Sequence, residues 1–314
     1  MKNANVHTIL EDLKISFKFA TKNVISYILA LFGVLIISGI LLVFVAILIF
    51  VPLFFSVGGI SGLTIFFESF STDISAGFTN LVVGAILIAL PLLAPFFVAI
   101  GALFGMGREI VESEGTSAEG VFTWYKKKFF SLAGGGLILF LVVLGPMILI
   151  LLSGIVVFGV DFFNFALITA GSASTMNPII GALLMAWFAF SLGFLSMLFP
   201  AIIDGYSVIE ATKKSIRMSI TYFDRVFGVW MAYLLIVGAL ILPLIATPLV
   251  IGISYPAAIM LGVIAIPALL FLVFVFLPAL TIGLTRVYMI LTADDDYEES
   301  PQENESGPSF IGGL

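Results

Sequence analysis

Long apolar stretches without charged residues dominate the chain. Five stretches contain no Asp, Glu, Lys or Arg, and together they hold 213 of the 314 residues. A helix needs about 20 apolar residues to span a bilayer, and in lipid its backbone polar groups must be satisfied within the segment. The pattern therefore predicts an all-α, polytopic membrane protein with six transmembrane helices. They are expected at Val24–Val51, Asn80–Phe104, Ser131–Val157, Gly181–Ile203, Val226–Gly252 and Ala257–Thr285.

The longest uncharged stretch is expected to contain two spans. It covers 60 residues between Arg225 and Arg286, which would form a single helix of about 90 Å at 1.5 Å per residue. Ser254, Tyr255 and Pro256 interrupt it and predict a short turn. The first 22 residues are polar and lack the apolar core of a signal peptide, so we expect the first span to be retained.

The positions of the cations predict the orientation. All 13 Lys and Arg residues lie on one side of the predicted spans, whereas the opposite loops contain only Glu68, Asp73 and Asp161 as charged residues. Short loops rich in Lys and Arg face the cytoplasm. We therefore expect a multi-pass protein of the cell membrane with both termini in the cytoplasm. The opposite loops are rich in Phe and are expected to lie in the outer interface.

Three basic segments are predicted to form helices that lie in the headgroup plane. Each begins with a candidate capping box, a hydroxyl residue followed three positions later by Glu: Thr8 with Glu11, Thr116 with Glu119, and Ser207 with Glu210. Downstream, apolar residues recur at three-to-four spacing opposite basic residues, which is typical of interfacial amphipathic helices. The expected apolar faces are Leu10, Leu13, Phe17 and Ala20; Ala118, Phe122, Tyr125 and Phe129; and Ile209, Thr212, Ile216, Ile220 and Phe223.

The three segments enter the membrane at similar distances from their caps, after 16, 15 and 19 residues. The chain is therefore predicted to be three repeats of an interfacial amphipathic helix plus a helical hairpin, with pseudo-threefold symmetry about the membrane normal. The alternative is that three unrelated amphipathic helices look alike. The membrane domain is expected at 1–292, with units at about 8–105, 116–203 and 207–292. An acidic, disordered cytoplasmic tail is expected at 293–314.

The segment from Asp204 to Gly228 resembles a known family. After Pro200, a small-residue turn leads into the pattern S-x-x-E-A-x-x-x-S, from Ser207 to Ser215, and then an aromatic and basic entry into the next span. This resembles the six-span membrane domain of glycerophosphoryl diester phosphodiesterases and related stand-alone prokaryotic membrane proteins. The resemblance implies a prokaryotic membrane module. It does not imply enzyme activity, because the family's catalytic domain is a soluble barrel that this chain could not form.

The sequence offers no constellation for catalysis or metal binding. With 61% hydrophobic and 10% charged residues, no soluble domain remains, and the lack of ionisable residues at mid-span argues against ion-coupled transport. There is no cysteine and a single histidine, His7, so histidine or thiolate metal sites and Ser-His-Asp triads cannot be assembled. The acidic run from Glu109 to Glu119 offers no single helical face for a cation. We predict no enzyme and no cofactor.

Ten cations are candidate ligands of anionic lipid headgroups, each contributing about 1 kcal/mol near the surface; alternatively, they only set the topology. They are Lys14, Lys18, Lys22, Lys126, Lys127, Lys128, Lys213, Lys214, Arg217 and Arg225. In the second span, Gly101 and Gly105 form a close-packing motif, either within the chain or between two copies. On the tail, Phe310, Ile311 and Leu314 are candidates for a motif that binds a cytoplasmic protein, or an idle terminus.

These features predict a non-enzymatic integral membrane protein that organises lipid or a membrane complex through its basic interfacial helices. Its expected partners are membrane lipids and a cytoplasmic protein, not nucleic acid. The alternative is a carrier or scramblase for an apolar or lipid-like substrate, without an ion-coupling relay. Prolines that could kink helices along such a path are Pro91, Pro95, Pro146, Pro200, Pro243, Pro248, Pro267 and Pro278.

Overall fold

The protein is all-helical in the part of the chain that the structure describes. The computed structural model describes residues 5–56, 58–62, 64–65, 74–113, 115–158, 176–251 and 254–299, which contain no β-strand. The helices are α1 (Val6–Lys22), α2 (Val24–Ser56), α4 (Ile74–Ser113), α5 (Ala118–Lys127), α6 (Phe129–Leu139), α7 (Gly145–Phe158), α9 (Met176–Phe194), α10 (Leu198–Asp204), α11 (Val208–Thr221), α12 (Phe223–Ile251), α13 (Tyr255–Phe271) and α14 (Leu277–Glu299). Two π-helical turns, Phe140–Leu144 and Leu272–Phe276, connect α6 to α7 and α13 to α14.

Six helical segments are long and apolar enough to cross a membrane, which confirms the predicted number of spans. Several run through the breaks and π-helical turns that separate the named helices. They cover Val24–Ser56, Pro91–Ser113, Phe129–Ile150, Gly181–Asp204, Phe223–Thr247 and Tyr255–Ala293.

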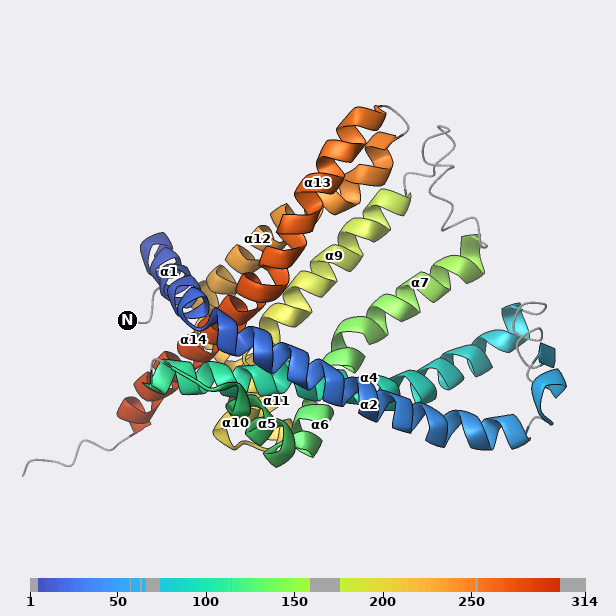
Figure 1. Cartoon of the computed structure of the whole chain (residues 1–314), viewed down its shortest axis with the longest axis horizontal. Helices are drawn as coiled ribbons and strands as arrows, with labels where there is room; N and C mark the ends of the chain where they lie inside the picture. Colours follow the sequence, from blue (N-terminus) through green and yellow to red (C-terminus); the bar gives the residue numbers. More distant parts are fainter. Residues whose placement is uncertain are drawn as a thin grey trace, which may run out of the picture.

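The helices gather at one end of the molecule and diverge toward the other (Figure 1). α1, α5, α10, α11 and the last turns of α14 lie near the gathered end, which we call the charged end, whereas α2, α4, α7, α9 and the α12–α13 hairpin spread apart from it. In the spans that contain α2, α12 and α13, only 11% of the most apolar window is buried within the protein. Such extensive apolar surface fits a lipid environment and not water.

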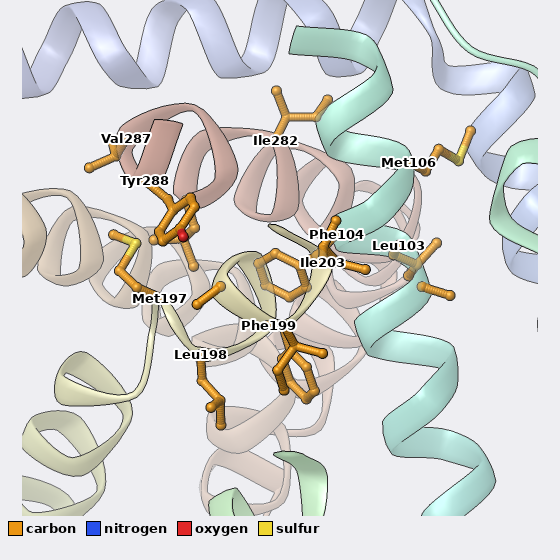
Figure 2. Packing of buried hydrophobic residues seen from close by; sticks show 14 of the residues in the cluster. Leu103, Phe104, Met106, Met197, Leu198, Phe199, Ile203, Ile282, Val287 and Tyr288 are labelled. Carbon is orange, nitrogen blue, oxygen red and sulfur yellow. The ribbon is translucent and has the colours of Figure 1, made fainter. Parts of the chain in front are cut away.

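The hydrophobic core lies at the charged end, where α4, α10 and α14 meet. Figure 2 shows Phe104 of α4, Phe199 and Ile203 of α10, and Tyr288 of α14 pointing into the space between these helices. All four side chains are buried, and the rings of Phe104 and Phe199 are stacked with their centroids 5.6 Å apart. Side chains therefore fill the centre of the bundle at this end.

Three short amphipathic helices, α1, α5 and α11, each lead into an apolar helix through a bend of one residue. The bend residues are Asn23, Lys128 and Tyr222. Their φ angles are −109°, −115° and −114°, and their ψ angles are 17°, 17° and 42°. In each case the N–H of the bend residue still bonds the carbonyl four residues earlier. The carbonyl of each bend residue also accepts from the N–H four residues later, so the bend residue keeps both of its own helical hydrogen bonds where the chain turns.

The amphipathic helices pack against different parts of the bundle. α5 packs mainly on α4 and α2, and α11 mainly on α10, α12, α6 and α9. Short loops join α4 to α5 and α10 to α11, so both helices fold back onto the segment before them. α1 instead packs on α14 and α12, at the opposite end of the sequence.

The predicted capping boxes of α1 and α5 are wrong. α1 begins one turn earlier, at Val6, where the side chain of Asn5 accepts a hydrogen bond from the N–H of Thr8 at 2.9 Å. Asn is as effective an N-cap as Ser or Thr, so Thr8 lies inside the helix. α5 begins after Ser117, which makes no side-chain cap bond. The hydroxyl of Thr116 donates to Glu109 instead.

The predicted tail is helical in its first part, contrary to the expected disorder. α14 continues through Glu299, because extending an existing helix needs no new nucleus. Residues 300–314, with the candidate motif of Phe310, Ile311 and Leu314, lie outside the described residues. The Phe-rich parts of the opposite loops at 66–73 and 159–175 also lie outside them.

Candidate lipid-binding surface

α11 begins at a capping box, the third of the predicted boxes and the one that is confirmed. Gly205, with a φ of 119°, ends α10 in the left-handed conformation, which glycine adopts without steric cost. The Ser207 hydroxyl then accepts from the N–H of Glu210 at 3.4 Å, while the Glu210 carboxylate accepts from the N–H of Ser207 at 3.1 Å. The Ser207 hydroxyl also donates to this carboxylate, and these hydrogen bonds lower the pKa of Glu210.

The buried face of α11 consists of Ala211, Ser215, Met218 and Ser219, of which all but Met218 are small. The hydroxyl of Ser215 donates to the carbonyl of Phe194 at 2.7 Å, and that of Ser219 to the carbonyl of Gly193 at 3.3 Å. Both carbonyls lie at the end of α9, before the break that leads to α10, and the Gly193 carbonyl also accepts from the N–H of Ser196 at 3.3 Å. α11 is therefore docked by its serines, which satisfy buried carbonyl groups.

The apolar face of α11 stays exposed. Between 39% and 65% of the surface is exposed at Ile209, Ile216 and Ile220 of this face and at Phe223, the first residue of α12. Lys213 and Arg217, one turn apart and both exposed, line an open hollow of about 390 Å³ together with Ile216, Ile220 and Thr221. An apolar stripe flanked by cations matches the boundary between acyl chains and headgroups.

The apolar face predicted for α1 mostly contacts protein, which corrects the expectation that it faces lipid. Leu13 and Ala20 are buried, and Phe17 packs against the core; Leu10 is 59% exposed. In α5, Val121 and Tyr125 are buried in the same way. The amphipathic pattern marks a face that avoids water, and in these two helices the neighbouring helices cover it.

The ten candidate headgroup ligands occupy three kinds of environment. Seven are exposed: Lys14, Lys18, Lys22, Lys126, Lys127, Lys213 and Arg217. Lys127 lies 5.5 Å from the ring centroid of Trp124. The partly buried Lys214 donates to the Tyr206 hydroxyl at 2.8 Å. Lys128 is half-buried at the bend after α5.

Arg225 is the exception, and its assignment to lipid is wrong. It is 5% exposed, and its Nε and Nη2 atoms bind the two carboxylate oxygens of Asp12 at 3.1 and 3.3 Å. Arg286 of α14 binds the same carboxylate through Nη1. The sequence interpretation did not pair Asp12 with either arginine. The sequence signal was the position of Asp12 on one helical face with Ser16 and Ala20, both fully buried.

A second polar cluster joins the ends of three helices. Arg108 of α4 binds Asp204 of α10 through Nη1 at 2.9 Å and Glu112 through Nε at 2.8 Å. The hydroxyl of Tyr288 on α14 donates to the other Asp204 oxygen at 2.9 Å. Asp204 therefore connects α4, α10 and α14 beside the hydrophobic core.

The close-packing glycines lie inside the chain's own interfaces. A Cβ at Gly101 would overlap Leu132 and approach Phe199, and a Cβ at Gly105 would overlap the ring of Trp124. Small residues permit this kind of close approach. Of the two predicted roles, packing within the chain and packing between two copies, both glycines serve the first.

No group of His, Cys, Asp and Glu side chains suitable for a metal ion occurs among the described residues. Glu109 instead accepts hydrogen bonds from the Trp124 indole at 2.8 Å and from Thr116 at 2.7 Å. Comparison with known proteins finds no matching family model, no matching curated protein and no matching solved structure. The resemblance to the phosphodiesterase membrane domain therefore stays a prediction.

Proposed function

We propose that the protein is a non-enzymatic, multi-pass protein of the cell membrane that organises lipid by binding anionic headgroups at its cytoplasmic face. The observation that carries this proposal is the free face of α11, where an exposed isoleucine stripe is flanked by Lys213 and Arg217. No protein segment among the described residues covers this stripe. An anionic lipid matches both features, because its headgroup can contact the cations and its acyl chains can contact the isoleucines.

We further propose that the chain consists of three repeats, each an amphipathic helix followed by a hairpin. The similar bends support this interpretation. Equivalent positions around the three bends are also buried in all three units. Seven residues before the bend they are Ser16, Val121 and Ser215; three residues before it, Ala20, Tyr125 and Ser219; and four residues after it, Tyr27, Leu132 and Val226.

The packing of the amphipathic helices also favours a closed arrangement of three units. α5 lies on the first unit and α11 on the second, while α1 lies on the third. The amphipathic helix of each unit would then pack against the preceding unit, and that of the first unit against the third. The three basic helices would surround the bundle at one membrane depth. Positive charge there matches the anionic inner leaflet and supports cytoplasmic termini.

The lipid proposal is tested by reversing the charge of the α11 face. The double substitution Lys213→Glu and Arg217→Glu removes two contacts of about 1 kcal/mol each, so phosphatidylglycerol should bind roughly 30-fold more weakly. Binding is measured by titrating the lipid into the full-length protein in neutral detergent micelles, followed by native mass spectrometry.

The matched control exchanges the two cations, Lys213→Arg with Arg217→Lys, and should retain the binding of wild type. Binding of phosphatidylglycerol that is equal in wild type and in the charge-reversed variant would contradict the proposed role of this face. So would equal binding of phosphatidylglycerol and phosphatidylcholine to wild type.

Lipid scrambling is a second candidate function, favoured by a hollow on the flank of the bundle. Its volume is about 280 Å³, and it lies between α4 and α6; its lining residues are Pro91, Ala94, Phe97, Ala133, Gly134 and Leu137. Because side chains fill the bundle centre at the charged end, a lipid would have to move along such an outer surface.

Proteoliposomes with a fluorescent lipid test this second candidate. Scrambling would be supported if the rate of lipid exchange between leaflets exceeds the rates in empty vesicles and in vesicles with an unrelated six-helix protein. In that case, filling the hollow with Ala133→Phe should slow the exchange. Rates equal to both controls would reject scrambling and leave the lipid-organising role.

A further inference from the structure

Asp12, Arg225 and Arg286 form a charge cluster that carries one more positive than negative charge. They come from α1, the start of α12 and α14. The side chains of Asp12 and Arg225 are 3% and 6% exposed, and that of Arg286 is 21% exposed. Among the described residues, Asp12 is the one carboxylate within ion-pair distance of either arginine. Burying an uncompensated charge is unfavourable, so the cluster favours a second anion.

The two arginines are engaged differently by Asp12. Arg225 uses both Nε and Nη2 and is held on both carboxylate oxygens. Arg286 contacts Asp12 through Nη1, which leaves its Nε and Nη2 donors without a partner among the described residues. A guanidinium presents donors in a fixed, planar fork that matches two oxygens of a phosphate. The partly exposed Arg286 can therefore receive an anion while Asp12 and Arg225 hold it in position.

We propose that Arg286, positioned by Asp12, binds the phosphate of an anionic phospholipid. The inference rests on the proposed lipid-binding function and adds a specific site to it. The source of the phosphate follows from the membrane depth of the site, because α1, on its face away from Asp12, exposes Lys14 and the apolar side chains of Val6 and Leu10. Such a mixed surface belongs at headgroup depth, where the phosphates available in quantity are those of lipids.

The site also has a structural consequence. α1 contacts α14 and α12 without a short loop to hold it there, unlike α5 and α11. A phosphate on Arg286 would neutralise the surplus charge at this contact and so stabilise the docking of α1. Anionic lipid should therefore stabilise the folded protein through this site, since a ligand bound to the folded state shifts the unfolding equilibrium.

The test compares variants by thermal unfolding of the full-length protein in neutral detergent, with increasing phosphatidylglycerol, phosphatidylcholine or inorganic phosphate. Arg286→Gln leaves the neutral pair of Asp12 with Arg225 and should raise the phosphatidylglycerol concentration needed for half of the stabilisation by about tenfold. Asp12→Asn removes the carboxylate that positions Arg286, so it should lower the melting temperature without lipid and also weaken the rise with phosphatidylglycerol. If Arg286→Gln does not fold, Arg286→Lys, which keeps the charge but loses the fork, should show an intermediate loss.

The α11 variant separates this site from the proposed function. If Lys213→Glu with Arg217→Glu abolishes the lipid effect while Arg286→Gln leaves it intact, the Arg286 site is rejected and the function stands. If Arg286→Gln abolishes the effect and the α11 variant keeps it, the Arg286 site stands and the role of α11 fails. Equal stabilisation by inorganic phosphate and phosphatidylglycerol would reject a lipid as the ligand.

Discussion

At the scale of single residues, the absence of a side chain determines how closely α4 approaches its neighbours. Gly105 faces the indole of Trp124, and that indole is fixed by its hydrogen bond to Glu109. Gly39, in contrast, has no heavy atom within 4 Å of the position that a Cβ would occupy. The same residue type therefore has a packing role at Gly105 and none at Gly39.

Gly105→Ala should destabilise the protein by about 1–3 kcal/mol, because the added methyl group forces the Trp124 ring or α4 to move. Gly39→Ala, its control, should leave stability unchanged or raise it slightly, since Ala favours helix. Thermal unfolding in detergent, followed by tryptophan fluorescence, measures both. Equal melting temperatures for the two variants would show that the contact at Gly105 relaxes without cost.

At the scale of elements, α11 shows what an amphipathic pattern leaves open. The pattern correctly predicted a helix with Ile216 and Ile220 on one face, but the docked face is that of Ser215 and Ser219. These serines are docked because their hydroxyls donate to the last carbonyls of α9, at the break before α10. The apolar face with Ile216 and Ile220 is then left exposed. In α1 the equivalent positions Ser16 and Ala20 are also buried, and the apolar Leu13 is buried beside them.

The start of α11 gives a pH-dependent prediction. Ser207→Ala removes the capping box and should cost about 1 kcal/mol at neutral pH. The pKa of Glu210 lies below its ordinary value of 4.5 in the folded protein, so the contribution of its carboxylate is present at neutral pH. It is lost as the pH falls below 4.5 through the folded pKa.

The difference in melting temperature between wild type and Ser207→Ala should therefore shrink between pH 5 and about pH 3. Ser117→Ala is the matched control, because Ser117 precedes α5 without a side-chain cap bond, and it should have little effect at either pH. A difference that does not change with pH would mean that Glu210 contributes nothing to the cap.

At the scale of the whole molecule, the charged end is assembled from distant parts of the chain. Polar contacts join α1 to α12 and α14 through Asp12, and α4 to α10 and α14 through Asp204. The apolar helices diverge from this end and expose their side chains. Polar contacts at one end and lipid-compatible surface elsewhere suit a protein that is held together at the headgroup level.

The absence of cysteine allows a direct test of the proposed orientation. Lys14→Cys, Lys126→Cys and Lys213→Cys place single thiols on the three amphipathic helices, and Tyr255→Cys places one at the opposite end of the α12–α13 hairpin, where Tyr255 is 66% exposed. A membrane-impermeant maleimide should label only the Tyr255 variant in intact cells. It should label the three lysine variants in inverted vesicles. Labelling of any lysine variant from outside would reject the cytoplasmic position of that helix.

The number of spans, the helical class and the three amphipathic helices were determined by the sequence alone. These features depend on local properties: the length of uncharged stretches, the spacing of apolar residues and the cap at Ser207. In a membrane this local information is sufficient, because lipid requires each segment to satisfy its own backbone. The ends of α1, α5 and α14 were less predictable, because several residues could cap or extend each helix.

Only the tertiary structure decided which faces are covered. Arg225 and Asp12 are separated by more than 200 residues, and nothing local distinguishes Arg225 from the exposed Arg217. Arg225 is buried because α1 packs on α12 and α14 and brings Asp12 to it. Ion pairs and glycine contacts of this kind depend on how helices meet, and that is set by packing of the whole bundle and not by the periodicity of any one helix.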